Sequence, residues 1–382
     1  MASPVRVLHC HSTFALGGKE ARAVRLMNAF GDAAEHVVLS AMPAALGARS
    51  AIARGVKVTF PDDAPSLAGQ PSPLRLLRLA DFLKRFDLVL TYNWGAFDAV
   101  MANRLFGRVP LIHHEDGFNE DEVTGLKGRR NLYRRFGLDG AWRLVVPSAR
   151  LERIALREWK QAPERLERIA NGVPVARFAS PPEAGALPGF ERRPGEIVIG
   201  TVAGLRAVKN LPRLVRAFAA MKSRQACLII VGEGPESERI AAEARTAGVA
   251  ARLAMPGFLA DPARWIGHFD IFALSSDSEQ FPISLVEAMA AGLPVVATAV
   301  GDVPAMVSAD NRPLIVEPGD EAAFAAALDS LADQPNLRRA IGAANREKAA
   351  SDYDEKAMIA AYARLYGEAI GRRDAFEKRI SS

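Results

Sequence analysis

Short apolar runs alternate with longer amphipathic segments through most of the chain. In the first half, the apolar runs cover residues 5–10, 36–40, 56–60, 87–91, 110–113 and 142–146. Such short runs predict strands that are buried on both faces, and the amphipathic stretches between them predict helices. This half is therefore predicted to fold as one doubly wound α/β domain.

The same alternation restarts in the second half, with apolar runs at residues 197–202, 227–231, 252–255, 271–274, 294–298 and 314–316. Between the halves, a Pro- and Gly-rich stretch without periodicity predicts a linker. We expect an N-terminal Rossmann-like domain over residues 1–176, a linker over 177–190 and a second Rossmann-like domain over 191–352. Residues 353–382 contain a predicted terminal helix, which periodicity alone does not place; packing back on the N-terminal domain is one option.

Parallel sheets of this kind bind ligands outside the carboxyl ends of their strands. Two such domains that face each other would hold a substrate in the cleft between them. Polar residues that directly follow the apolar runs are therefore the first candidates for a functional site.

Two carboxylates, Glu279 and Glu287, stand eight positions apart across a predicted junction of loop and helix. Ser284 is a favoured N-cap residue, and a Gly and a Pro follow the segment, so a helix is predicted over residues 285–291. The first backbone amides of that helix would bind an anion such as phosphate, and the carboxylates would accept hydroxyl hydrogens of a sugar. A second interpretation stays open, in which Ser284 and Glu287 form a capping box and Glu279 is an ordinary loop acid.

Two cations, Arg206 and Lys209, follow the apolar run 197–202, and Asn210 is predicted to cap the next helix. At the carboxyl end of a strand, the two cations would neutralise a departing diphosphate without the help of a metal ion. Two surface cations on a turn are the alternative.

Glycine-bearing loops follow two further runs. Gly232 and Gly234 would allow a tight turn close to a ligand, but Ser237 stands where a dinucleotide fingerprint has its third glycine, so a nicotinamide cofactor is poorly supported. Gly17 and Gly18 follow the first run and would let the backbone approach a donor phosphate or an acceptor. A simple turn is the alternative for this pair.

A polar cluster of His113, His114 and Asp116 lies at the end of the run 110–113. At the carboxyl end of a strand, it would orient a transferred sugar or an acceptor hydroxyl. A structural hydrogen-bonding role is the alternative. A metal site is disfavoured, because adjacent histidines cannot easily share one ion and no further ligand motif is present.

Composition narrows the class of protein. The chain has 382 residues, is 49% hydrophobic and has no apolar run of 18 residues, so we expect neither a membrane span nor a secretory signal, and a cytoplasmic location. Cys10 and Cys227 lie inside apolar runs and are expected to be buried rather than paired or bound to zinc. The net charge of +5 is concentrated in residues 1–176, which carry 25 Lys and Arg against 18 Asp and Glu.

Part of this basic charge lies in two predicted amphipathic helices, at residues 73–86 and 127–136. Their cationic faces would suit anionic lipid or a phosphorylated partner, although a solvated face on an ordinary packed helix is the alternative. A nucleic-acid partner is not expected, because the basic residues are not interleaved with aromatic ones.

In this order, the segments resemble those of a retaining glycosyltransferase of the GT-B fold, in family 4 of that classification. The resemblance extends over nearly the whole chain. Within the family, the chain is similar to sugar transferases of exopolysaccharide and lipopolysaccharide type. Its most specific motif is Glu279 with Glu287, followed by the small-residue stretch that ends at Thr298. The other shared segments are Gly17-Gly18, Asn171–Pro174, Gly204–Asn210, Val231–Pro235 and Gly257-Phe258.

The resemblance implies roles for these residues. Arg206 and Lys209 would hold the donor diphosphate, Glu287 would bind the ribose hydroxyls and Glu279 would face the donor sugar. Further donor contacts would come from Gly17, Gly18, Gly232, Gly257, Phe258, Phe281, Pro282, Ile283, Ser284 and Leu285, with the Gly257-Phe258 turn next to the base.

For the N-terminal domain, the resemblance implies a histidine near the reacting sugar. His113 is the better positional match and would be catalytic together with Glu279, Arg206 and Lys209. His114 and Asp116 would contact the acceptor; similar family members tend to carry a second histidine close to the position of Asp116.

The implied activity is the transfer of a sugar, with retention, from a nucleoside diphosphate sugar to a hydroxyl of a glycan or lipid-linked acceptor. It would need neither metal nor cofactor and would serve cell-surface polysaccharide biosynthesis. The N-terminal domain would bind the acceptor and the C-terminal domain the donor, with peripheral contact to the inner face of an anionic membrane. The alternatives are a nucleotide-sugar epimerase or hydrolase of the same fold, or a non-catalytic nucleotide-sugar-binding protein.

Overall fold

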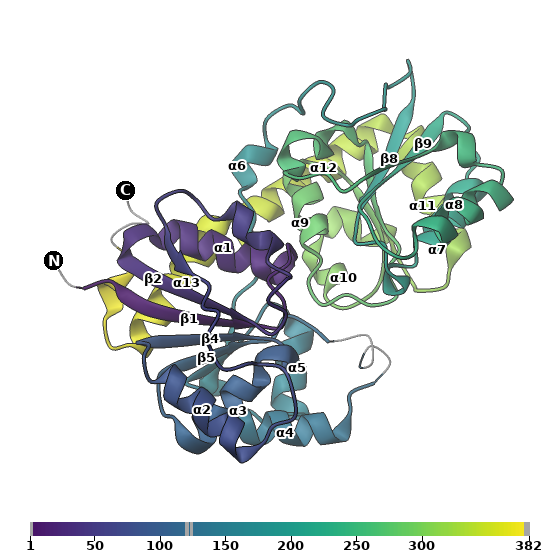
Figure 1. The fold of residues 1–382 in the computed structure, drawn as a ribbon. Coiled ribbons are helices and arrows are strands. Elements are labelled where there is room, and N and C mark those ends of the chain that lie inside the picture. The colour runs from purple at the N-terminus through teal and green to yellow at the C-terminus, as the bar shows by residue number, and fades with distance from the viewer. Residues whose placement is uncertain (1–2, 119–121, 123–124, 378–382) are drawn as a thin grey trace. The chain divides into compact units, whose positions relative to one another are not determined.

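The computed structural model describes residues 3–118, 122 and 125–377 of the chain. By contacts between Cα positions it divides into two compact units (Figure 1). Unit 1 comprises Met1–Asn171 and Lys356–Ser382, and unit 2 comprises Gly172–Glu355. Unit 1 is therefore built from both ends of the chain.

Unit 1 contains a parallel sheet with the strand order β3-β2-β1-β4-β5-β6-β7. Its strands are β1 (Val5–His11), β2 (Ala34–Ser40), β3 (Lys57–Thr59), β4 (Leu88–Tyr92), β5 (Leu111–His114), β6 (Arg143–Val146) and β7 (Leu166–Arg168). The first six agree with the apolar runs of the sequence. The edge strand β7 was missed, because it has only three residues and two of them are charged.

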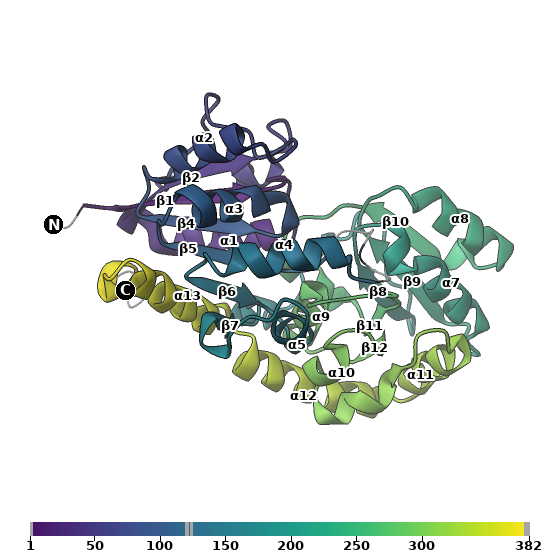
Figure 2. The ribbon, with the colours of Figure 1, turned by 90° about the horizontal axis from the view of Figure 1, so that it is seen from below.

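Helices cover both faces of this sheet, as Figures 1 and 2 show. One face packs against α1 (Gly18–Phe30) and α13 (Glu355–Ala369), around a core that includes Phe30, Tyr362 and Tyr366. The other face packs against α2 (Pro73–Leu83), α3 (Phe97–Phe106), α4 (Gly128–Leu138) and α5 (Ala149–Arg157). The terminal helix α13 thus completes the core of unit 1.

Unit 2 contains a parallel sheet with the order β10-β9-β8-β11-β12-β13. Its strands are β8 (Ile197–Val202), β9 (Ala226–Val231), β10 (Leu253–Gly257), β11 (Ile271–Leu274), β12 (Val295–Thr298) and β13 (Ile315–Val316). Helices α7 (Leu211–Ala220), α8 (Ser237–Thr246) and α11 (Glu321–Asp333) cover one face. Helices α9 (Ile283–Ala290) and α12 (Pro335–Asp352) pack together on the other, and α6 (Val175–Phe178) and α10 (Val303–Met306) are single turns.

Both sheets place their strands in the same order, outward from a central first strand. This confirms the predicted class of two doubly wound Rossmann-like domains. Both cysteines are free and buried, as expected. No helix in the described parts of the chain is long and apolar enough to cross a membrane.

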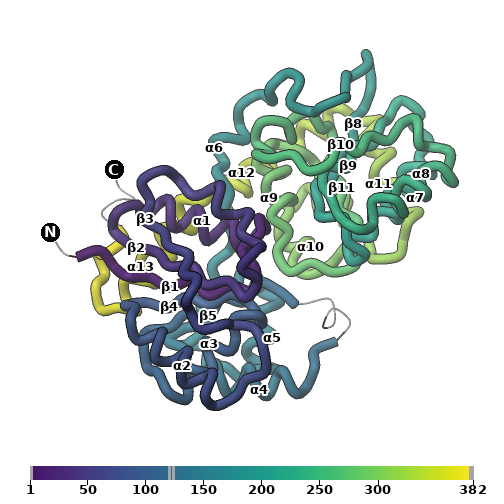
Figure 3. Tube along the Cα trace, in the orientation of Figure 1, coloured from purple at the N-terminus to yellow at the C-terminus, as the bar shows by residue number. Residues whose placement is uncertain are grey.

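The stretch predicted as a linker, residues 177–190, lies within unit 2. Figure 3 shows it as the segment that leads from α6 into β8. Glu183 forms an ion pair with Arg264 at 2.7 Å, and Leu187 is buried. The unit boundary at Asn171 precedes the predicted one, and residues 378–382 of the predicted terminal segment lie outside the described residues.

Candidate functional site

Helix α9 begins at Ile283, after Pro282 as its N-cap residue. The prediction of Ser284 as the N-cap is wrong, because the fixed φ of Pro282 suits the entry to a helix and the helix starts directly after it. The capping-box interpretation is wrong for the same reason, since Ser284 lies inside the first turn. The amides of Ile283 and Ser284 precede that of Leu285, which donates to the Pro282 carbonyl at 3.2 Å, and they form the positive end of α9.

An ion pair connects the loop after β8 to the loop before α9. The Lys209 ammonium lies 2.6 Å from Oε1 of Glu279, and that oxygen also accepts a hydrogen bond of 2.7 Å from the Ser276 hydroxyl. The Thr298 hydroxyl donates to the Ser276 carbonyl at 2.6 Å and holds this turn in place. The Glu279 side chain is therefore fixed close to the start of α9, with 8% of its surface exposed.

Arg206 lies in the same loop, just before the 3-10 turn Ala207–Lys209, and is exposed. The buried hydroxyl of Ser275 supports the loop by donating to the carbonyl oxygens of Lys209 and Asn210, at 3.1 and 3.0 Å. The Asn210 side chain accepts a hydrogen bond from the Arg213 amide at 3.3 Å and caps α7, which confirms the predicted cap.

The loops after β8 and β9 pack backbone against backbone. A Cβ on Gly232 would lie 1.8 Å from the Ala203 carbonyl oxygen, and one on Gly234 would lie 2.4 Å from the Leu205 carbonyl oxygen. Both glycines also have a positive φ, at 141° and 157°. Any other residue at either position would push the β8 loop, which carries both cations, out of place.

The turn at Gly257-Phe258 lies next to this pair of loops. The Gly257 carbonyl accepts a hydrogen bond of 2.9 Å from the Gly232 amide, and the Phe258 amide donates to the Glu233 carboxylate at 3.3 Å. The Phe258 ring is 54% exposed, which is unusual for an aromatic side chain. It offers a flat apolar surface at the edge of the loops that hold Arg206.

Unit 2 therefore contains most of the predicted donor-site residues, on the loops that follow β8, β9, β10 and β11. Within this set, Leu285 is buried and its amide donates to the Pro282 carbonyl at 3.2 Å, and Phe281 packs edge-on against Tyr353. Glu287 lies in the second turn of α9 and is 8% exposed. The members of the set are Arg206, Lys209, Gly232, Gly257, Phe258, Glu279, Phe281, Pro282, Ile283, Ser284, Leu285 and Glu287.

Gly301, in the loop after β12, was missed by the sequence analysis. Its φ is 59°, and a Cβ there would lie 2.1 Å from the Glu279 carbonyl oxygen. Its position just after a strand, where the other loops also carry glycines, is the signal that could have found it. Ser276 and Thr298, which hold Glu279, gave no comparable signal.

Gly17 and Gly18 belong to unit 1, at the carboxyl end of β1. Gly17 is the N-cap residue of α1, and a Cβ there would lie 2.9 Å from the Glu20 carboxylate. Glu20 forms an ion pair with Lys19, and its burial raises its pKa. The start of α1 thus carries its own carboxylate within the first turn.

His113 and His114 end β5 and point to opposite faces of the sheet, because side chains alternate along a strand. His113 is 1% exposed; its Nδ1 lies 2.8 Å from the Thr91 hydroxyl, and its Nε2 lies 3.7 Å from the Glu115 carboxylate. This enclosure favours the structural interpretation of His113 over direct contact with a sugar.

His114 is enclosed as well. Its Nδ1 lies 3.2 Å from the Thr91 carbonyl oxygen, and its Nε2 lies 2.9 Å from the Tyr366 hydroxyl on α13. Burial holds the pKa of His114 well below its ordinary value. Asp116 forms an ion pair with the buried Arg22, so both predicted acceptor residues already have partners within unit 1.

Two charged residues next to these histidines were missed. Glu115 is fully buried, and neither carboxylate oxygen has a hydrogen-bond partner among the described residues. The nearest cation is Arg134, whose Nε lies 3.5 Å away and whose guanidinium binds Glu122 and lies 4.9 Å from the ring of Trp94. No pattern in the sequence distinguishes this buried pair from surface charges.

Three further histidines are buried in unit 1. His9 Nε2 lies 3.0 Å from His36 Nδ1, and its Nδ1 lies 3.3 Å from the Tyr92 hydroxyl. The ring of His11 stacks on Tyr92 at 4.0 Å. Burial lowers the pKa of all three histidines, that of His36 to about 4, so they are neutral at pH 7.

Two protein-family models match the chain. The model for glycosyl transferases group 1 matches residues 188–348, and the model for glycosyltransferase family 4 matches residues 16–177. Together they extend over both units of the structure.

Curated relatives and a solved structure agree with these models. An N-acetyl-alpha-D-glucosaminyl L-malate synthase of Bacillus anthracis is 27% identical over 46% of this chain and 46% of its own length. A D-inositol 3-phosphate glycosyltransferase of Mycobacterium marinum is 30% identical over 75% of this chain and 66% of its own length. The crystal structure of Anabaena HepE in complex with UDP matches 95% of this chain and 100% of its own, with a TM-score of 0.77 and 19% identity.

Proposed function

The chain belongs to the group 1 glycosyl transferases and has their GT-B fold, and from this premise we propose that it moves a sugar from a nucleoside diphosphate sugar to a hydroxyl of a glycan or lipid-linked acceptor. The transfer retains the configuration of the anomeric carbon and needs no metal ion. The transfer serves cell-surface polysaccharide biosynthesis. It takes place in the cytoplasm, at the inner face of the membrane.

The observation that carries this proposal is the ion pair of Lys209 and Glu279 beside the start of α9. It places a cation, a fixed carboxylate and a row of backbone amides at one edge of the sheet. A diphosphate would bind the cation and the amides, while the carboxylate would accept a hydrogen bond from a hydroxyl of the attached sugar.

Three further donor residues have roles in this arrangement. Arg206 is exposed in the same loop and would bind the diphosphate oxygens in a bidentate manner. Glu287 would accept hydrogen bonds from the ribose hydroxyls, and the exposed ring of Phe258 would lie against the base.

The reaction follows from this placement. The bond from the anomeric carbon to the diphosphate oxygen breaks while the acceptor oxygen attacks from the same face, and the acceptor proton passes to the departing diphosphate. Arg206, Lys209 and the positive end of α9 stabilise the charge that develops on the leaving group. In unit 1, His113 positions the end of β5 rather than touching the sugar.

The acceptor differs among the relatives, since one is named for L-malate and another for D-inositol 3-phosphate. Both names contain a compound with free hydroxyl groups, which supports a hydroxyl acceptor here. Because this chain covers only 46% and 66% of those two proteins, their acceptors are not transferred to it.

Thermal stabilisation by nucleotides tests the proposal. We would heat the wild type, Glu287→Ala, Arg206→Ala and the surface control Arg245→Ala with UDP, GDP, ADP, CMP, NAD and the corresponding nucleotide sugars. A ligand at 100 times its dissociation constant stabilises the folded state by about 2.7 kcal/mol. We expect one nucleoside diphosphate to stabilise the wild type and the control but neither site variant.

Four other outcomes would contradict the proposal. If NAD stabilises the protein, or if no nucleotide does, the donor site is wrong. If the nucleotide sugar is consumed equally fast with and without an acceptor, the enzyme is a hydrolase or an epimerase, and if it binds without being consumed, the protein is a non-catalytic binder.

A further inference from the structure

Large apolar side chains are exposed on three neighbouring helices of unit 1. Among the described residues, nine large hydrophobic side chains are exposed, and six of them lie on α2, α3 and α4. Leu132 is 69% exposed and Leu74 is 59% exposed; the others are Leu77, Leu105, Phe106 and Phe136. A gathering of this kind marks an interaction surface, whereas single exposed leucines do not.

The same three helices enclose an apolar groove. Its volume is about 340 Å³, and its walls include Leu76 of α2, Leu105 of α3, and Leu132, Tyr133 and Phe136 of α4. Figure 2 shows the three helices beside one another. Three of the six exposed side chains, Leu105, Leu132 and Phe136, line this groove, and we name the outer surface of the three helices the α2–α4 face.

This face carries a strong excess of positive charge. The three helices contain seven arginines and two aspartates, but Arg134 is buried against Glu122, which also pairs with Arg130. Both aspartates are already neutralised, Asp81 by Lys84 at 2.8 Å and Asp98 by Arg75. Arg78, Arg104, Arg129 and Arg135 are exposed.

Cations and apolar groups alternate closely on the α2–α4 face. The Arg104 guanidinium lies 5.4 Å from the centre of the Phe136 ring. Arg104 also lines a neighbouring cavity of about 390 Å³ together with Arg108, Arg165 and one acidic residue, Asp139. Guanidinium groups at this spacing can bind phosphate groups while the apolar side chains enter the layer below them.

We propose that the α2–α4 face docks on an anionic phospholipid bilayer. Its leucine and phenylalanine side chains enter the boundary between head groups and acyl chains, and its arginines contact the lipid phosphates. The inference rests on the proposed function in one respect, because docking would bring unit 1 to the surface where lipid-linked acceptors reside. It does not depend on the donor residues of unit 2.

Vesicle flotation of the whole chain tests the proposal. We would compare vesicles of phosphatidylcholine alone with vesicles that also contain phosphatidylglycerol, at low and high salt. The wild type should bind only the anionic vesicles, and less at high salt. Leu132→Asn with Phe136→Asn should lower binding by about tenfold or more, because each side chain would leave an apolar layer.

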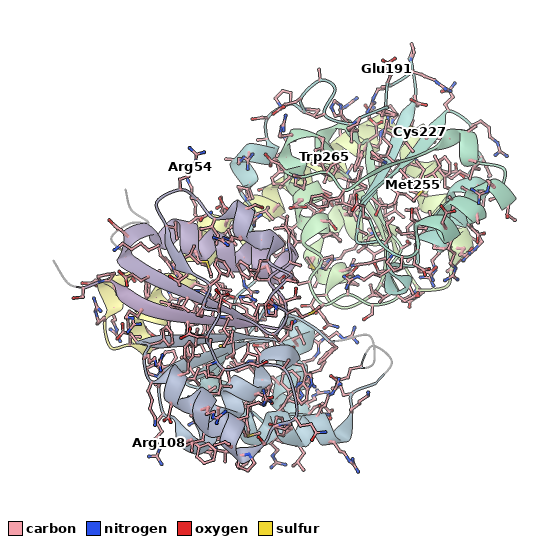
Figure 4. All side chains as sticks on the ribbon, viewed as in Figure 1. Arg54, Arg108, Glu191, Cys227, Met255 and Trp265 are labelled. Atoms are coloured by element: carbon pink, nitrogen blue, oxygen red, sulfur yellow. The ribbon has the colours of Figure 1, made fainter. Side chains whose placement is uncertain are left out.

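Charge variants and matched controls locate the contact. Arg104→Gln and Arg129→Gln should each lower binding by about fivefold, in accord with roughly 1 kcal/mol per basic residue at an anionic surface. Arg54→Gln and Met42→Asn, which change exposed residues of unit 1 outside these helices, should bind like the wild type. In Figure 4, Arg54 and Arg108 lie at opposite ends of unit 1.

Three results would overturn the proposal. The wild type could fail to bind anionic vesicles, or the α2–α4 variants could bind as well as the controls. Light scattering could instead show a wild-type dimer that the Leu132 and Phe136 changes dissociate, with no vesicle binding, which would assign the face to a second copy of the chain. Nucleotide stabilisation of the same samples reports on the donor site separately, so that failure of either proposal is recognised by itself.

Discussion

The two units use the same strand order but treat the polar residues at their strand ends differently. In unit 2, Arg206 is exposed, whereas Glu279 and Glu287 are each only 8% exposed. In unit 1, His113, His114 and Glu115 at the end of β5 are buried almost completely. Position at the carboxyl end of a parallel strand therefore does not by itself make a residue available to a ligand.

The difference arises from what packs over each sheet. His114 of β5 bonds to Tyr366 on α13, which lies 252 positions further along the chain. In unit 2, Glu279 beside the start of α9 is held both by Ser276, three positions away, and by Lys209, 70 positions away. A helix from the far end of the chain covers the end of β5 in unit 1, whereas the loop after β8 in unit 2 leaves Arg206 exposed.

The largest expected effect separates turnover from stability. Arg206→Ala should lower turnover by about 10²–10³-fold, because one group that stabilises the transition-state charge is lost. Its free energy of unfolding should change by less than about 0.5 kcal/mol, because the residue is exposed. Initial rates and denaturant unfolding of the same sample measure both quantities.

His113→Ala should lower the free energy of unfolding strongly and turnover only weakly, the reverse of Arg206→Ala. Removal of a buried ring that bonds to Thr91 should lower the free energy of unfolding by about 2–4 kcal/mol. Turnover of the protein that remains folded should fall much less than in Arg206→Ala. A loss of turnover as large as that of Arg206→Ala, at unchanged stability, would show instead that His113 touches the sugar and that the comparison of the two units is wrong.

A pair of glycines tests whether close packing shapes the donor site. In Gly301→Ala, the new Cβ would lie 2.1 Å from the Glu279 carbonyl oxygen at a φ of 59°. We expect a cost of about 3 kcal/mol, from a left-handed backbone and from overpacking, and weaker stabilisation by the nucleotide.

Gly319 is the matched control for Gly301. Its φ is 103°, and no atom lies within 4 Å of the Cβ position. Gly319→Ala should lower the free energy of unfolding by only about 1–2 kcal/mol, from backbone strain, and the nucleotide should stabilise it as much as the wild type. Equal loss of nucleotide stabilisation in both variants would mean that contact with Glu279 is irrelevant to binding.

The buried histidines predict that acid destabilises unit 1 more than unit 2. His9, His11, His36 and His114 have folded-state pKa values below the ordinary value of 6.5, that of His36 at about 4. At a pH between the folded-state pKa and 6.5, the unfolded chain binds more protons than the folded chain. The contribution of the neutral histidines to the free energy of unfolding is therefore fully present above pH 6.5 and is lost as the pH falls below it. The slope for each histidine is at most about 1.4 kcal/mol per pH unit.

Hydrogen exchange at pH 7 and pH 5, corrected for the intrinsic rate, measures this effect for peptides of each unit. Unit 2 contains a single histidine, His268, and serves as the internal control. His36→Gln removes one titrating group and should flatten the pH dependence of unit 1. Equal destabilisation of both units at pH 5 would contradict the assignment to the buried histidines.

Much of the fold could be predicted from the sequence, because buried parallel strands produce a pattern of their own. The apolar run 271–274 coincides with β11, and the Asn210 cap is where the side chain predicted it. The start of α9 was misplaced because Ser284 is a good cap in isolation, whereas Pro282 sets the backbone two residues earlier. Ser284 thus has the preference of a cap residue, but the backbone constraint of Pro282 decides where the helix begins.

The arrangement of unit 1 could not be predicted in the same way. The place of α13 depends on Tyr362 and Tyr366 packing against strands near the other end of the chain. The burial of Glu115 with Arg134 depends on three-dimensional packing that no local spacing reports. Sequence therefore indicated which residues stand at the strand ends but not which of them remain accessible.

The smallest effect concerns the turn after the first strand of each unit. In unit 2, Asn210 caps α7 with its side chain at a φ of 42°, whereas in unit 1 Gly17 precedes α1 without a side-chain cap. Asn210→Ala should destabilise unit 2 by about 1 kcal/mol through the lost cap, with some added strain from the left-handed backbone. Asn210→Gly should cost only a few tenths of a kcal/mol.

Urea unfolding of the two Asn210 variants compares these costs directly. Glycine loses the same side-chain hydrogen bond as alanine but adopts a positive φ without strain, so the difference between the variants isolates the backbone contribution. If the two variants are equally destabilised, the hydrogen bonds of the Asn210 side chain, with the Arg213 amide and with the Asp277 carboxylate, hold the turn. If only the alanine variant is destabilised, the left-handed backbone at Asn210 sets the course of the loop that presents Lys209, and a glycine can replace Asn210 there.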